Sequence, residues 1–284
     1  MSAVTEIRPS PITGTWYEGK AERLARAVDG YIANAELPNL PGEVVAIIAP
    51  HAGHRYSGPV AGYAFATIKG CTPDVVAVVS PMHHPYPYSF ITSAHSAYAT
   101  PLGEIPVNRG LINDLDGRLK QRLGFGMTLV VNDPEHSLEI ELPFLQRSVQ
   151  SAFSLLPLML RKQTREFTRE FGEALAETLS GRNALLVAST DLSHFYDQAT
   201  ANRLDATMLA QVEAFSPDGI FDVEQAGTGE ACGFGAVAAV LWAAKALGAD
   251  TVKVLHHATS GDVTGDYHRV VGYGAAVVMK EGKK

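Results

Sequence analysis

The stretch VVAIIAPHAGHRYSG, from Val44 to Gly58, decides how the rest of the sequence is interpreted. Residues 44–49 form an apolar run that is typical of a buried strand, and Pro50 ends it. Two histidines, His51 and His54, follow directly. Because ligands of open α/β sheets bind beyond the carboxyl ends of the strands, imidazoles in this position indicate a functional site if the pattern is repeated.

The pattern is repeated after three further apolar runs. Residues 75–81 lead into His83 and His84, residues 183–190 into Asp191 and His194, and residues 251–255 into His256 and His257, with His268 shortly after. Only His95 and His136 do not follow a predicted strand. One such histidine would be an ordinary loop residue, but eight of them at four matching positions predict a shared ligand site.

Stretches of helical periodicity alternate with these apolar runs. Helices are predicted over 18–36, 57–70, 137–153, 163–181, 198–215 and 233–248, and strands over 44–50, 75–81, 89–100, 154–160, 183–190, 251–258 and 270–279. Nearly continuous apolar strands between helices predict an α/β fold, with a central mostly parallel or mixed sheet covered by helices on both faces. No repeat or long linker interrupts the chain, so we expect a single domain over 1–284 that begins with an irregular segment, 1–17.

Composition excludes several classes of function. The net charge of −7 is spread along the chain and would repel a phosphate backbone, so we expect no nucleic-acid partner. Two cysteines are too few for a secreted disulfide scaffold. The sequence shows neither a signal peptide nor an apolar run of about 18 residues, so we expect no membrane partner and a cytoplasmic location.

Cys232, His136 and the pair Asp191 and His194 are further candidates for chemistry. Cys232 lies where a glycine-rich stretch meets a predicted helix, whose N-terminus would favour the thiolate, although packing beside glycines is the alternative. His136 lies in an acidic loop before a predicted helix that Ser137 could cap. Asp191 and His194 could form a proton relay or orient a metal-bound imidazole. Cys71 has no such context and is predicted to be structural.

Taken in order, GTWY, PHAGHRYSG, SPMHH, EHSLEIELPF, STDLSH and ACGFGA resemble the Memo family, whose bacterial and archaeal members are called AmmeMemoRadiSam system protein B. The resemblance extends over nearly the whole chain. It implies a fold related to the class III extradiol dioxygenases, which bind non-haem iron. The metal ligands that it implies are His51, His83 and Cys232.

The same resemblance implies the residues around the metal. Catalytic roles are expected for His136, Asp191 and His194. The resemblance also implies a substrate pocket that includes Trp16 and Tyr17, with residues 1–17 at its rim. We expect His54, Tyr56 and His84 in this pocket as well, although His54 stands where the family usually has an aromatic residue. Cysteine stands where the dioxygenases have a carboxylate ligand, and a thiolate donates more charge and is oxidised more readily.

The expected function is therefore a non-haem metal-dependent oxidoreductase acting on an unknown small molecule, with iron as the first choice of metal and copper or zinc as alternatives. His136 or His194 would act as acid or base, with Asp191 orienting His194. A metal- or thiol-dependent hydrolase with Cys232 as nucleophile is one alternative. Another alternative is a non-catalytic adapter that binds a peptide in a groove lined by Trp16, Tyr17 and Tyr56. The family name also implies radical-SAM and AMMECR1-like partner proteins.

Overall fold

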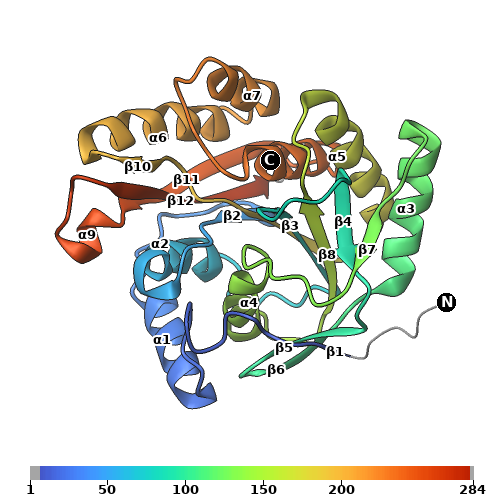
Figure 1. The fold of residues 1–284 in the computed structure, drawn as a ribbon, viewed down its shortest axis with the longest axis horizontal. Helices are drawn as coiled ribbons and strands as arrows, with labels where there is room; N and C mark the ends of the chain where they lie inside the picture. Colours follow the sequence, from blue (N-terminus) through green and yellow to red (C-terminus); the bar gives the residue numbers. More distant parts are fainter. Residues whose placement is uncertain (1–6, 282–284) are drawn as a thin grey trace.

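The computed structural model describes residues 7–281 as a nine-stranded mixed sheet with helices on both faces and a second, three-stranded sheet at one side (Figure 1). The predicted α/β fold with a mixed, centrally parallel sheet is confirmed. The predictions for residues 1–6, and for the end of the expected domain at 282–284, fall outside the described residues.

The elements have the following bounds. The strands are β1 (Ile7–Arg8), β2 (Glu43–Ala49), β3 (Val75–Pro81), β4 (Phe90–Ser93), β5 (Ala97–Thr100), β6 (Gly103–Pro106), β7 (Thr128–Val130), β8 (Ser154–Leu160), β9 (Ala184–Ser189), β10 (His194–Tyr196), β11 (Thr251–Thr259) and β12 (Val270–Lys280). The helices are α1 (Ala21–Ala33), α2 (His54–Ala66), α3 (Arg109–Leu123), the 3-10 helix η1 (Glu139–Glu141), α4 (Leu142–Ser148), α5 (Arg165–Leu179), α6 (Gln198–Glu213), α7 (Pro217–Gln225), α8 (Phe234–Ala246) and α9 (Gly261–Thr264).

Four parallel strands form the centre of the large sheet, in the order β2, β9, β3 and β8. Antiparallel strands extend it on both sides, with β12 beside β2 and β4 beside β8. All seven residues of β3 are buried, as the valine-rich sequence predicts for a strand covered on both faces. The carboxyl ends of β2, β9 and β3 therefore meet at one edge of the sheet.

Helices cover the two faces in separate layers (Figure 1). On one face α2 packs on β2 and β12, with α1 and α4 beside it. On the other face α8 packs on β2, β9 and β3, and α5 and α7 cover its outer side. Ten residues of α8, from Gly235 to Ala244, are buried without a break. A helix packed on opposite sides needs apolar residues all around, which explains its sequence AVAAVLWAA.

Two predicted elements were wrong in ways that bear on the site. Residues 89–100 form two strands, because β4 joins the large sheet while β5 pairs with β1 and β6 in the small one. The predicted helix over 137–153 is split into η1 and α4, because Pro143 has no amide hydrogen with which to continue a helix through that turn. Ser137 does not cap a helix; its hydroxyl donates to the carbonyl of Pro81 at 2.8 Å.

Other elements carry weaker signals and were not predicted, among them α3, α7, α9 and the short strands β6, β7 and β10. The ends of α3 are well specified by single residues. The Asn108 side chain accepts a hydrogen bond from the amide of Leu111 at the start, and Gly124, with φ of 78°, ends the helix. The other missed elements are short, between three and nine residues, so periodicity alone does not find them.

Candidate metal centre

Three histidines lie together at the edge of the sheet where β2, β9 and β3 end. One nitrogen from each of His51, His83 and His136 lies within 4.8 Å of the other two, a spacing that could hold a metal ion. The rings of His83 and His136 stack with centroids 4.8 Å apart, and His51 meets both edge-on. We call His51, His83 and His136 the histidine cluster.

Glu135 orients two members of the histidine cluster. Its carboxylate accepts hydrogen bonds from the amide of His83 at 2.6 Å, from Nδ1 of His83 at 2.9 Å and from the amide of His136 at 2.9 Å. Nδ1 of His136 lies 3.2 Å from the same carboxylate. With Nδ1 used in this way, Nε2 of each ring is left for a metal, the arrangement that fixes tautomers at metal sites.

Sequence reasoning missed Glu135 as a functional residue, although it directly precedes His136. Burial would raise the pKa of its carboxyl group, but the hydrogen bond and charge of His83 outweigh burial and hold the pKa well below its ordinary value. No local pattern indicates that this side chain turns toward His83, which is 52 residues away in the chain.

His51 is held from behind by Ser189 and Glu141. Nδ1 of His51 lies 3.0 Å from Oγ of Ser189, and that hydroxyl lies 2.7 Å from both the carbonyl of Ser137 and Oε1 of Glu141. Burial raises the pKa of Glu141 well above its ordinary value. Ser189 donates its hydroxyl hydrogen to the carbonyl of Ser137 or to Oε1 of Glu141, so its oxygen can accept a hydrogen bond from Nδ1 of His51.

The sulfur of Cys232 approaches the histidine cluster from the loop before α8. Sγ lies 3.1 Å from Nε2 of His51 and 3.6 Å from the carbonyl oxygen of Asp191. Burial, together with the nearby Asp191 carboxyl group, raises the pKa of the Cys232 thiol. The helix start therefore does not by itself produce the expected thiolate, and a positive charge at the cluster would be needed to favour it.

The predicted roles of Asp191 and His194 need a correction. Instead of orienting His194, the carboxylate of Asp191 accepts hydrogen bonds from the amides of His51 at 2.7 Å and Ala52 at 3.2 Å, so it positions the chain that carries His51. Burial raises the pKa of Asp191 to about 7 against the effect of those two amides. The carboxylate beside His194 is Glu230, which accepts from the His194 amide at 3.1 Å and was not predicted.

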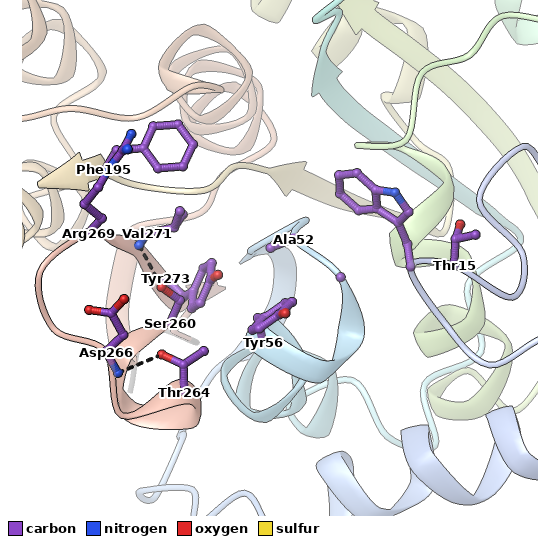
Figure 2. Close-up of a pocket in the computed structure, with 12 residues that line it drawn as sticks. Thr15, Ala52, Tyr56, Phe195, Ser260, Thr264, Asp266, Arg269, Val271 and Tyr273 are labelled. Atoms are coloured by element: carbon purple, nitrogen blue, oxygen red, sulfur yellow. Dashed lines mark hydrogen bonds between the residues drawn. The ribbon is translucent and has the colours of Figure 1, made fainter.

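A pocket of about 500 Å³, drawn in Figure 2, adjoins the histidine cluster, although none of the three histidines lines it. Ala52, which follows His51, lines it, and so does Trp16, whose ring lies 4.1 Å from that of His136. Tyr56 contributes an exposed aromatic ring, and Figure 2 shows Phe195 and Arg269 on the side opposite Tyr56. The predicted pocket residues Trp16 and Tyr56 thus lie where a molecule near the cluster would bind.

Other expected pocket residues lie elsewhere. Tyr17 is buried, and its hydroxyl donates to Glu139 at 2.8 Å. His54 is the first residue of α2 rather than a loop residue, and its Nε2 lies 2.9 Å from the carbonyl of Ile140. Both line a smaller cavity of about 240 Å³ on the other side of Trp16. His84 follows His83 without lining the larger pocket.

The fourth predicted group of histidines does not join the site. His256 and His257 lie inside β11, because the strand continues to Thr259. His256 stacks on Tyr63, and Nε2 of His257 lies 2.8 Å from the buried carboxylate of Asp205. His268 lies on an exposed loop. The strand-end argument fails for β11 because its histidines pair with β12 rather than following the strand.

The burial of His54 predicts a pH dependence of stability. Burial lowers the pKa of His54 to about 4, while in the unfolded chain it returns to about 6.5. The folded state therefore resists protonation, so stability is complete above pH 6.5 and falls as the pH drops toward 4, by about 3 kcal/mol from this residue. Urea titrations should show that the free energy of unfolding of the parent falls by about this much more than that of His54→Phe between pH 7 and pH 4. A constant difference between the two proteins would contradict the assignment.

The loop that carries Glu135 and His136 is fixed by a buried arginine. All three guanidinium nitrogens of Arg8 donate: Nε and one terminal nitrogen to the carboxylate of Asp133 at 3.0 and 2.9 Å, that same terminal nitrogen to the carbonyl of Glu135 at 2.8 Å, and the other to Glu139. The Arg8 side chain is 1% exposed. Strand β1 thus anchors the loop through Arg8. The sequence analysis did not predict this contact.

The donors at this site fit a borderline or soft transition metal. Burial lowers the pKa of His51 well below its ordinary value and that of His136 to about 4, so both rings are neutral and able to bind a metal. Imidazole nitrogens with an adjacent sulfur suit iron, copper or zinc, whereas magnesium and calcium prefer oxygen ligands.

Comparisons with known proteins find the same family along nearly the whole chain. A family model described as Memo-like protein matches residues 8–277, which is nearly all of the described chain. A MEMO1 family protein of Nitrosopumilus maritimus is 31% identical over 274 residues, which cover 95% of this chain and 98% of the relative. Similar proteins of Methanopyrus kandleri and Thermotoga neapolitana are 30% and 33% identical, and the alignments cover 97% and 96% of this chain and 99% of each relative. None of the helices within residues 7–281 has the length and apolar character needed to cross a bilayer.

Proposed function

Because the chain belongs to the Memo-like family, we propose that it is a metal-dependent oxidoreductase that acts on a small molecule in the pocket beside the histidine cluster. The observation that supports this most is the group of three imidazole nitrogens within 4.8 Å of one another, backed by Glu135 and Ser189. Iron or copper bound there would supply electron transfer to or from the substrate and dioxygen, and zinc would supply only Lewis acidity.

In this proposal His51 and His83 hold the metal with Cys232 as the third ligand. His136 is the other candidate for that place, because its nitrogen belongs to the same cluster. Glu135 would keep the Nδ1 protons of its histidine partners pointing away from the metal, and Ser189 would do the same for His51. His194, beside Glu230, would hold or release a proton at the pocket.

The proposal predicts the metal content of variants. Anaerobically purified protein should hold about one iron or copper ion per chain, and His51→Ala and His83→Ala should each hold almost none. Cys232→Ser and His136→Ala would show which side chain is the third ligand. His268→Ala, on an exposed loop, is the matched control and should keep its metal. A parent protein that takes up no redox metal, or His51→Ala protein with full content, would overturn the proposal.

A thiol-dependent hydrolase is the second candidate, since Sγ of Cys232 lies 3.1 Å from Nε2 of His51. Burial works against it by raising the pKa of the thiol. Alkylation with iodoacetamide separates the two functions. A metal ligand reacts only after a chelator is added, whereas a free nucleophile reacts equally fast with and without it. The radical-SAM and AMMECR1-like partners and the cytoplasmic location stay predictions.

A further inference from the structure

One end of the pocket beside the histidine cluster is built by a β-bulge. In the pairing of β10 with β12, His194 lies opposite Val271 and Tyr196 opposite Val270, so Phe195 is the extra residue. Phe195 has a φ of 66°, which is rare for a residue with a side chain, and its ring is 60% exposed. An exposed aromatic ring in a left-handed conformation is a combination that folding alone does not favour.

The ring of Phe195 supports a cation. The guanidinium carbon of Arg269 lies 5.3 Å from the centroid of the Phe195 ring, and Figure 2 shows the two side chains together at the pocket. Within residues 7–281, the Arg269 side chain has no ion pair and no hydrogen bond. Its planar fork of N–H donors is therefore free to bind a carboxylate, with the aromatic ring limiting the positions that it can take.

The remaining lining limits what else the ligand can carry. Trp16 and Tyr56, each 38% exposed, offer aromatic surface for a ring, whereas Tyr273 is buried. Asp266, the acidic residue of the lining, accepts a hydrogen bond from the amide of His268 at 3.0 Å and forms no ion pair with Arg269. Its negative charge would disfavour a dianion such as a phosphate monoester. The volume of about 500 Å³ suits a small molecule rather than a folded segment of protein.

We propose that this pocket binds a small aromatic monocarboxylate, whose carboxylate pairs with Arg269 and whose ring packs on Trp16 and Tyr56. Calling this ligand the substrate rests on the proposed function, but its binding does not require the metal. Phe195 acts as a positioning residue that holds the guanidinium of Arg269 at the pocket. The bulge in β10 is what directs Phe195 to that place.

Ligand-observed NMR titration of chelator-treated protein tests the proposal. Phenylacetate should bind at least about tenfold more tightly than benzyl alcohol, which lacks the charge, and than phenethylamine, which reverses it. It should also bind more tightly than phenyl phosphate, because of Asp266. Equal binding of phenylacetate and benzyl alcohol, or tighter binding of phenyl phosphate or the amine, would overturn the proposal. Removing the metal keeps this outcome separate from the metal analysis above.

Two variants separate recognition from folding. Arg269→Gln should weaken phenylacetate binding about tenfold and leave benzyl alcohol unaffected, whereas Arg165→Gln, a surface control that pairs with Asp218 and Asp222, should change neither. Phe195→Gly removes the ring and suits a φ of 66°, so its Tm should equal or exceed that of the parent while phenylacetate binds several-fold more weakly. Unchanged phenylacetate binding in both Arg269→Gln and Phe195→Gly would contradict the assignment.

Discussion

Replacing Arg8 with methionine is expected to lower the free energy of unfolding by about 3–5 kcal/mol, measured by urea denaturation. The change leaves the carboxylates of Asp133 and Glu139, both buried, without their cation. Methionine fills a similar volume, so the loss of stability would come mainly from the unpaired charges and not from a cavity. The metal affinity should also fall, because Arg8 holds the carbonyl of Glu135 next to His136.

Arg165→Met is the matched control for this change. Arg165 also pairs with two carboxylates, Asp218 and Asp222, but all three side chains are exposed, and such pairs contribute about 0–1 kcal/mol. Arg8→Lys keeps the charge but cannot make the forked contact with Asp133, so an intermediate loss is expected. If Arg8→Met were no more destabilising than Arg165→Met, the buried ion pairs would not anchor the loop.

Replacing Glu135 with glutamine should weaken metal binding by about 10–100-fold. Both carboxylate oxygens accept hydrogen bonds, one from the amide of His83 and the other from its Nδ1 and from the amides of His136 and Ser137. A glutamine must place its NH₂ group against one of these donors. The histidine rings then lose the acceptor that fixes their tautomer. Zinc titration against a chromophoric chelator measures the change.

Glu141→Gln provides the comparison, because Glu141 is also a buried glutamate and is linked to the ring of His51 by two hydrogen bonds, through Ser189. Burial raises the pKa of Glu141, which favours its uncharged form, and the carbonyl oxygen of a glutamine can still accept the hydrogen bond from Ser189. Zinc affinity should therefore change by less than about threefold. Equal losses in Glu135→Gln and Glu141→Gln would show that the charge of Glu135 is not what orients the cluster.

Much of the fold could be predicted from local sequence. Strands β2, β3 and β9 were predicted correctly because an apolar run of six or seven residues between turn signals is typical of a strand that is buried on both faces. The positions of His51 and His83 followed from the same runs, since parallel strands place their carboxyl ends at one edge. The predicted strand over 89–100 was wrong because alternation does not tell which sheet a strand joins.

The supports of the site could not be predicted in this way. Arg8 meets Asp133 across 125 positions of sequence, and Ser189 meets Glu141 across 48. By itself the sequence determined which strands are buried and which imidazoles follow them, because burial and strand ends depend on neighbouring residues. Only the tertiary structure decided which carboxylate faces which histidine, and that Phe195 stacks on Arg269. These contacts depend on how elements far apart in the sequence pack together, and the local sequence around each residue does not determine that packing.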